Sequence, residues 1–169
     1  MASGTPASLA PLASGGMAGI PGDQIGPLMH QVVPYVATLG LEYLEATPER
    51  TVVVLRDEPE RRNHVGGPHA AVMFAAAESA TGAAAIAAFG DMMDRAVLLP
   101  VTATMDYVAI ARGDVTATAR VNGDIDAARA TFDAGSRPEI EISCEITDSA
   151  GTVTGRVLTR WTLKALKKA

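Results

Sequence analysis

The feature that most constrains the fold is a long apolar segment, residues 69–89. It is rich in alanine, which has the highest helix propensity, and its one formally charged side chain is Glu78. A helix that is apolar on every side must be enclosed by other protein or by lipid. Alanine contributes little to bilayer insertion, and a charge near the middle of a span is costly. The segment therefore predicts a buried central helix rather than a membrane span.

The remainder of the chain is mainly β-like. Two short runs precede the central helix, and four follow it. In the last two runs, apolar and polar residues alternate, as in Ile140, Ile142, Cys144 and Ile146, which predicts antiparallel neighbouring strands. Tight turns are expected at 112–114 and 149–151. The six predicted strands cover residues 39–46, 51–56, 96–111, 115–121, 139–148 and 153–163.

Two further helices are predicted outside the centre. Residues 23–36 repeat apolar side chains at three- and four-residue steps, and Pro34 is expected to end that helix. Residues 124–134 form a shorter helix, with Asp124 as its cap and Gly135 as its stop. Residues 1–22 carry no charged side chain and are interrupted by Pro and Gly, so we expect a disordered lead, followed by one domain over 23–169.

One arrangement satisfies these elements: an α+β fold in which a curved antiparallel sheet wraps around one long central helix. A single sheet covers only part of the surface of an apolar helix, so we expect a second copy of the chain to bury the other side. Only 4% of the residues are aromatic, so the core is filled by small and aliphatic side chains, which also favours burial through association. We expect a homodimer, with a dimer of dimers as the larger alternative.

Charge and cysteine content narrow the class of protein. The net charge of −5 gives no indication of a basic surface that would bind a nucleic-acid backbone, so nucleic acid is not an expected partner. The single cysteine, Cys144, cannot form an intrachain disulfide and is interpreted as a sheet residue, consistent with a cytoplasmic location. The histidines His30, His64 and His69 lack a visible third ligand, so no metal site is predicted.

Glu78 is the most informative side chain for function. A carboxylate among alanines is costly to desolvate and has no basic partner on its own helix. It either reaches a rim or the sheet as a structural group, or serves as a general base or nucleophile with a raised pKa. The helix face shared with Glu78 carries Ala71, Ala75 and Gly82, which leave room either for another backbone or for a substrate chain.

The loop before the central helix supplies a second candidate group. Asn63, Gly67 and His69 lead to the helix start, where free N–H groups such as that of Ala70 can hold an oxyanion. Glu78 lies nine residues beyond His69, roughly 13 Å along the axis and on the opposite face. If these groups act together, the active site must combine residues of two subunits.

The stretch 63–78 resembles the signature of the PaaI-like hotdog thioesterases. That signature has an Asn, a His six residues later, and an acidic residue nine beyond the His, and both spacings are met. The resemblance implies a hotdog fold in which the Ala70 N–H polarises the thioester carbonyl, Asn63 positions the reacting group, and Glu78 of the partner subunit activates water or attacks. His69 would shape the loop. The family's Ser or Thr opposite the acid would correspond to Thr102 or Thr104, for which ordinary strand threonines are the alternative.

Two residues depart from the family pattern. Ala70 and Ala71 stand where Gly-Gly is usual, and Glu78 replaces an Asp. Neither change removes the chemistry. The extra segment 124–134 resembles that of a less characterised hotdog subfamily.

The leading expectation is hydrolysis of acyl-CoA or a related thioester, with no cofactor beyond the CoA of the substrate. The alternatives are a non-catalytic acyl or acyl-CoA binding protein and, with less support, a hydratase or dehydratase. CoA phosphates would need surface arginines, and the sequence does not choose among them. The candidates are Arg61, Arg62, Arg95, Arg112 and Arg120.

Overall fold

The computed structural model describes residues 22–166, which form six strands and four α-helices. The prediction of a disordered lead over 1–22 lies outside the described residues, apart from Gly22, which begins the first helix. The helices are α1 (Gly22–Val32), α2 (Pro34–Leu39), α3 (Ala70–Phe89) and α4 (Ile125–Asp133). The strands are β1 (Glu42–Ala46), β2 (Thr51–Leu55), β3 (Ala96–Tyr107), β4 (Val115–Val121), β5 (Glu139–Asp148) and β6 (Val153–Ala165).

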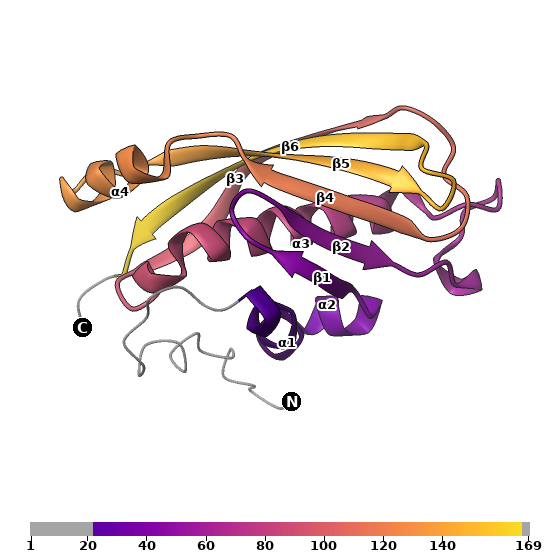
Figure 1. Ribbon diagram of the computed structural model, residues 1–169, viewed down its shortest axis with the longest axis horizontal. Coiled ribbons are helices and arrows are strands. Elements are labelled where there is room, and N and C mark those ends of the chain that lie inside the picture. The colour runs from indigo at the N-terminus through magenta and orange to yellow at the C-terminus, as the bar shows by residue number, and fades with distance from the viewer. Residues whose placement is uncertain (1–21, 167–169) are drawn as a thin grey trace, which may run out of the picture.

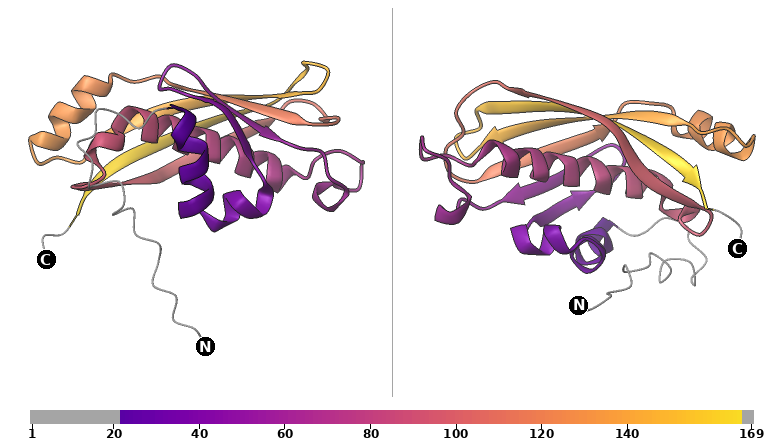
Figure 2. Two further views of the ribbon diagram at one scale, coloured as in Figure 1. Left: turned by 60° about the horizontal axis from the view of Figure 1, so that its bottom comes forward. Right: turned by 180° about the vertical axis from the view of Figure 1, so that it is seen from behind.

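The six strands form one antiparallel sheet in the order β1-β2-β4-β5-β6-β3. Figures 1 and 2 show α3 running along one face of this sheet, with α1 and α2 on the same side. The predicted arrangement of a sheet around a central helix is therefore confirmed. β3 and β1 form the two edges, and β3 is much the longer of the two.

Small side chains on both surfaces bring α3 close to the sheet. Ala76, Ala80 and Ala83 have no exposed surface, and Ala117 and Ala119 of β4 are equally buried. Without bulky side chains between them, helix and sheet approach closely and exclude water from the backbone. By length and composition, the segment Ala70–Met92 could also cross a membrane, but 67% of its most apolar window is buried inside the protein. The helix therefore packs against the sheet as the centre of the hydrophobic core.

The first predicted helix is present but is interrupted at Val33, and helical structure continues beyond residue 36 to Leu39. Pro34 does end α1, but it also begins α2, because a proline that lacks an N–H fits the first position of a helix. Gly40, with φ 57°, then ends α2 in the left-handed conformation. The strand predicted to start at residue 39 consequently starts at Glu42.

The turn at 112–114 does not join neighbouring strands. Gly113 adopts φ 69°, as a turn requires, but β3 pairs with β6 whereas β4 lies between β2 and β5. The chain therefore crosses from one edge of the sheet to its interior. The predicted strand 96–111 ends earlier, at Tyr107.

The extra helix is confirmed, together with both of its end signals. The Asp124 side chain accepts a hydrogen bond from Ala127 N at 2.9 Å, and Gly135 follows the helix with φ 82°. Arg129 fastens α4 to the end of α3 by donating to Asp91 at 2.7 Å and to the Ala88 carbonyl at 2.6 Å. The carbonyls at a helix C-terminus lack intrahelical partners, so this arginine satisfies one of them.

Candidate functional site

Glu78 is partly buried in the middle of α3, in an apolar setting. Burial raises the pKa of its carboxyl above the usual 4.5. In the described part of the chain it forms no ion pair, so no cation compensates for its desolvation. A carboxylate in this situation is held ready to accept a proton.

Two adjoining hollows meet at Glu78. The first, the inner cavity, has a volume of about 340 Å³ and lies between α1, α3, β3 and β6. Glu78 and Ser79 provide its polar side chains. The remaining residues that line the inner cavity are Met29, Val32, Val33, Gly82, Ile86, Met93, Leu98, Pro100 and Trp161.

The second hollow, the edge groove, has a volume of about 510 Å³ and follows α3 from Ala71 toward Glu78. Its other wall is the exposed edge strand β3, at Val101 to Ala103. The predicted small residues are thus divided: Ala71 and Ala75 border the edge groove, and Gly82 borders the inner cavity. Both hollows border these small residues within one subunit.

A half-buried tyrosine that the sequence analysis did not predict lies beside this acid. Tyr43 of β1 has a hydroxyl with no hydrogen-bond partner of good geometry within the described residues. Burial raises the pKa of Tyr43, a contact with the Ser79 hydroxyl opposes this, and the charge of Glu78 raises it further. The side chain stands three residues beyond Gly40, and no local pattern in the sequence links it to Glu78.

The loop before α3 is organised by Asn63. Its amide oxygen accepts from Val65 N at 3.0 Å and from Gly67 N at 3.4 Å, and its amide nitrogen donates to the Pro68 carbonyl at 3.1 Å. Gly67 is buried, and a side chain there would collide with the carbonyl oxygen of Ala111. Within one subunit, Asn63 therefore holds the loop in shape.

The start of α3 leaves one N–H free. His69 caps the helix by accepting a hydrogen bond from Ala71 N on its Nδ1 at 3.0 Å. The His69 carbonyl accepts from Val72 N and Met73 N, at 3.0 and 3.1 Å. The N–H of Ala70 has no partner among residues 22–166, so it is available as a donor at the positive end of the helix dipole.

The two threonines on β3 are placed differently. Strand pairing sets Thr102 opposite Arg160 and Thr104 opposite Leu158, on the face of the sheet away from α3. Thr102 still borders the edge groove because β3 is the edge strand. Thr104 borders a third hollow, described next, and is not brought to Glu78.

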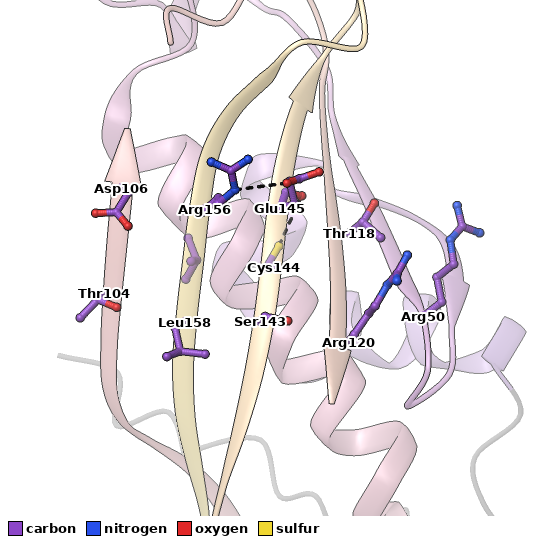
Figure 3. Close-up of a pocket in the computed structure, with 11 residues that line it drawn as sticks. Arg50, Thr104, Asp106, Thr118, Arg120, Ser143, Cys144, Glu145, Arg156 and Leu158 are labelled. Atoms are coloured by element: carbon purple, nitrogen blue, oxygen red, sulfur yellow. Dashed lines mark hydrogen bonds and ion pairs between the residues drawn. The ribbon is translucent and has the colours of Figure 1, made fainter. Parts of the chain in front are cut away.

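The third hollow, about 610 Å³, lies on the outer face of the sheet (Figure 3). Among its charged side chains, Arg156 and Glu145 form an ion pair at 3.3 Å. Cys144 borders this hollow but is 3% exposed, and burial raises the pKa of its thiol to about 12. This hollow is separated from Glu78 by the sheet itself.

The five candidate arginines fall into separate regions. Arg61, Arg62 and Arg112 surround the loop before α3; Arg112 donates to the Val65 carbonyl at 2.7 Å, and Arg62 pairs with Asp57 at 2.8 Å. Arg95 pairs with Asp133 of α4, and Arg120 lies in the outer hollow. Only the first three lie near the helix start.

Solved structures with the same fold are numerous, and three illustrate the likeness. A probable thioesterase from Pseudomonas aeruginosa, described as a protein of unknown function, is 21% identical with a TM-score of 0.77, covering 90% of this chain and 100% of its own. AziG of S. sahachiroi is 27% identical with a TM-score of 0.62, covering 79% and 98%. The PaaI protein of the E. coli phenylacetic acid degradation operon is 14% identical with a TM-score of 0.66, covering 88% and 95%.

These likenesses confirm the predicted hotdog fold. No curated protein matches the sequence. A family model described as a domain of unknown function (DUF4442) matches residues 23–163, nearly the whole described domain. The chain therefore belongs to the DUF4442 family and has distant structural relatives among probable and putative thioesterases.

Proposed function

We propose that the protein is a thioesterase of the PaaI-like type that hydrolyses acyl-CoA or a related thioester to the free acid and CoA. The observation that carries this proposal is the position of Glu78, an uncompensated carboxylate with a raised pKa at the junction of two hollows. Such a group suits general-base catalysis near neutral pH. The thioesterase-like relatives add support at the level of the fold.

In the proposed reaction, Glu78 takes a proton from a water molecule as the water oxygen attacks the thioester carbonyl carbon. The carbonyl oxygen becomes an oxyanion, which accepts a hydrogen bond from the Ala70 N–H. When the intermediate collapses, the C–S bond breaks and the leaving CoA thiolate receives the proton from Glu78. No cofactor is needed, and the CoA phosphates would lie near Arg61, Arg62 and Arg112.

The two reacting groups must come from different subunits. Ala70 and Glu78 of one chain are eight residues apart on one helix, or about 12 Å along the axis. One carbonyl cannot contact both. The long edge strand β3 is hydrogen-bonded on one side only and exposes Val101 (39%), so it suits pairing with a second copy. In such a homodimer, each edge groove is covered by the partner.

The decisive test is an assay of acyl-CoA hydrolysis by wild type and three variants. We expect Glu78→Gln to lower kcat by about 100- to 10,000-fold, the range for loss of a general base. Asn63→Ala should lower activity by loosening the loop. Glu145→Gln, which removes an exposed carboxylate of the outer hollow, is the matched control and should leave activity unchanged.

The same assay separates turnover from the alternative, a protein that binds acyl thioesters without cleaving them. Wild-type activity in both Glu78→Gln and Asn63→Ala, with the fold intact by circular dichroism, would refute the catalytic assignment. Wild-type protein that binds acyl-CoA but releases no CoA thiol would establish the binding alternative.

A further inference from the structure

The inner cavity is polar at one end and apolar along the rest of its length. It begins at Glu78 and Ser79 and continues along α3 past Gly82 to Ile86. The indole of Trp161 forms part of the wall, and its N–H is already used in a hydrogen bond to Thr81 Oγ1 at 3.1 Å. Beyond the acid, the cavity therefore presents hydrocarbon and an aromatic ring, which suits an apolar chain attached to a polar group.

The shape of the cavity follows from one missing side chain. Gly82 has no Cβ, and one placed there would come within 3.3 Å of the Trp161 ring. A larger residue would thus fill the space between α3 and β6. On the other side, Met29 and Val32 of α1 and the following Val33 line the cavity. Val32 and Val33 are partly exposed, so this wall covers the cavity only in part.

The length of the cavity sets the size of its occupant. Glu78 and Ile86 are eight residues apart, about 12 Å of helix. A fully extended peptide advances about 3.5 Å over three bonds, so a singly bonded chain covers about 12 Å in roughly ten bonds. The cavity volume of about 340 Å³ lies in the range of pockets that hold small molecules.

Building on the proposed thioesterase function, we infer that the inner cavity is the acyl-chain site and that its ligand class is the unbranched saturated acyl chain of about eight to twelve carbons. The carbonyl carbon lies by Glu78, and the chain runs along α3 toward Ile86. In the homodimer, the chain enters the subunit that contributes the acid.

The chain contains one tryptophan, so tryptophan fluorescence reports on Trp161, which lines this cavity. We would titrate the full-length Glu78→Gln variant with saturated fatty acids of four to sixteen carbons and with phenylacetic acid. The Gln side chain removes the repulsion between two carboxylates. Affinity should rise about fourfold per added methylene, level off near ten to twelve carbons, and be weak for phenylacetic acid. No change in Trp161 fluorescence, or the tightest binding for phenylacetic acid or the sixteen-carbon acid, would overturn the inference.

A second measurement uses variants at the far end of the cavity. Ile86→Phe should shorten the preferred chain by two or more carbons, and Met93→Ala should lengthen it. Leu44→Phe is the control, because Leu44 lies on β1 and is 66% exposed. Unchanged chain-length preference in both cavity variants would also overturn the inference.

These outcomes are separable from those of the proposed function. Chain-length-dependent binding at Trp161 without thioester hydrolysis by the wild type would sustain the site and refute the enzyme. The opposite result would be hydrolysis that depends on Glu78, with a chain-length preference that the Ile86 and Met93 variants do not change and with no fluorescence response of Trp161. It would support the proposed enzyme and refute the acyl-chain site.

Discussion

At the scale of single residues, the protein maintains one acid in an unfavourable position. Glu78 lies among alanines, with two neighbouring hydroxyls, those of Ser79 and Tyr43, and with no cation paired to it in the described part of the chain. Desolvation without compensation destabilises the charged form. A residue that costs stability in its ionised state is consistent with a functional role rather than a structural one.

This cost gives a pH-dependent prediction. In the unfolded chain the Glu78 carboxyl ionises near its ordinary pKa of 4.5, and in the folded protein it ionises at a higher pH. Below pH 4.5 the carboxyl is protonated in both the folded and the unfolded state. As the pH rises toward the folded-state pKa, the unfolded state has already lost its proton, so the free energy of unfolding falls.

The Tm of Glu78→Gln should therefore exceed that of wild type at about pH 8, and the difference should vanish near pH 4. Differential scanning calorimetry across this range measures it. Glu145→Gln, which loses an exposed and ion-paired carboxylate, should not show the same gain. A Tm difference for Glu78→Gln that grows as the pH falls would contradict the assigned direction.

At the scale of elements, α3 connects the two halves of the proposed chemistry. Its N-terminus offers the Ala70 N–H, which has no partner among the described residues, while its middle carries the acid. His69 satisfies the next N–H and leaves the first one open. The His69 cap thus stabilises the helix and leaves the Ala70 N–H available as a hydrogen-bond donor.

Ala70→Pro tests this donor by deleting the N–H. Proline is well tolerated at the first helical position, and His69 already has the extended backbone (φ −65°, ψ 141°) that proline requires before it. We expect the Tm to stay the same or rise, while kcat falls about 100- to 1,000-fold through loss of an oxyanion donor.

The matched control for that variant is Ile125→Pro at the first position of α4, where the preceding Asp124 also has an extended backbone (φ −79°, ψ 109°). Helix α4 lines neither of the hollows at Glu78. This control removes a comparable N–H and should leave hydrolysis unchanged. Full activity in Ala70→Pro would show that the oxyanion is held elsewhere.

At the scale of the whole molecule, one subunit is an incomplete enzyme under the proposed function. Its edge groove lies open beside the unpaired edge of β3, and its donor and its acid are about 12 Å apart on the same helix. Both features are resolved by a symmetric dimer, in which each site joins the donor of one chain to the acid of the other.

Mixed dimers test this arrangement. Glu78→Gln and Ala70→Pro subunits, each inactive alone, should regain activity when refolded together, because a mixed dimer contains one intact site and one doubly defective site. With random pairing at equal amounts, about a quarter of all sites are intact, so we expect about a quarter of wild-type activity.

Each variant refolded with itself serves as the control for the mixture. Activity that stays at the level of the two separate variants would show that donor and acid act within one chain. A stable monomer that hydrolyses substrate, detected by light scattering of the active fraction, would have the same meaning.

The sequence by itself determined most of the elements and singled out Glu78 as the candidate acid. Alanine content and the absence of other charges predicted α3, the alternation through Ile140 and Ile146 predicted β5, and Asp124 and Gly135 marked the ends of α4. Each of these signals depends on residues within one or two turns, or on neighbours along one strand, so it is legible in the linear chain.

Only the tertiary structure decided which residues surround Glu78. Three of these residues come from separate elements: Tyr43 from β1, Met29 from α1 and Trp161 from β6. No local sequence pattern predicts that they lie close together. Thr104, one of two candidates for the family's Ser or Thr opposite the acid, borders the outer hollow because β3 pairs with β6 in the register that sets it opposite Leu158. Strand order and register are settled by contacts between distant segments, and these contacts have no counterpart in the spacing of residues along the chain.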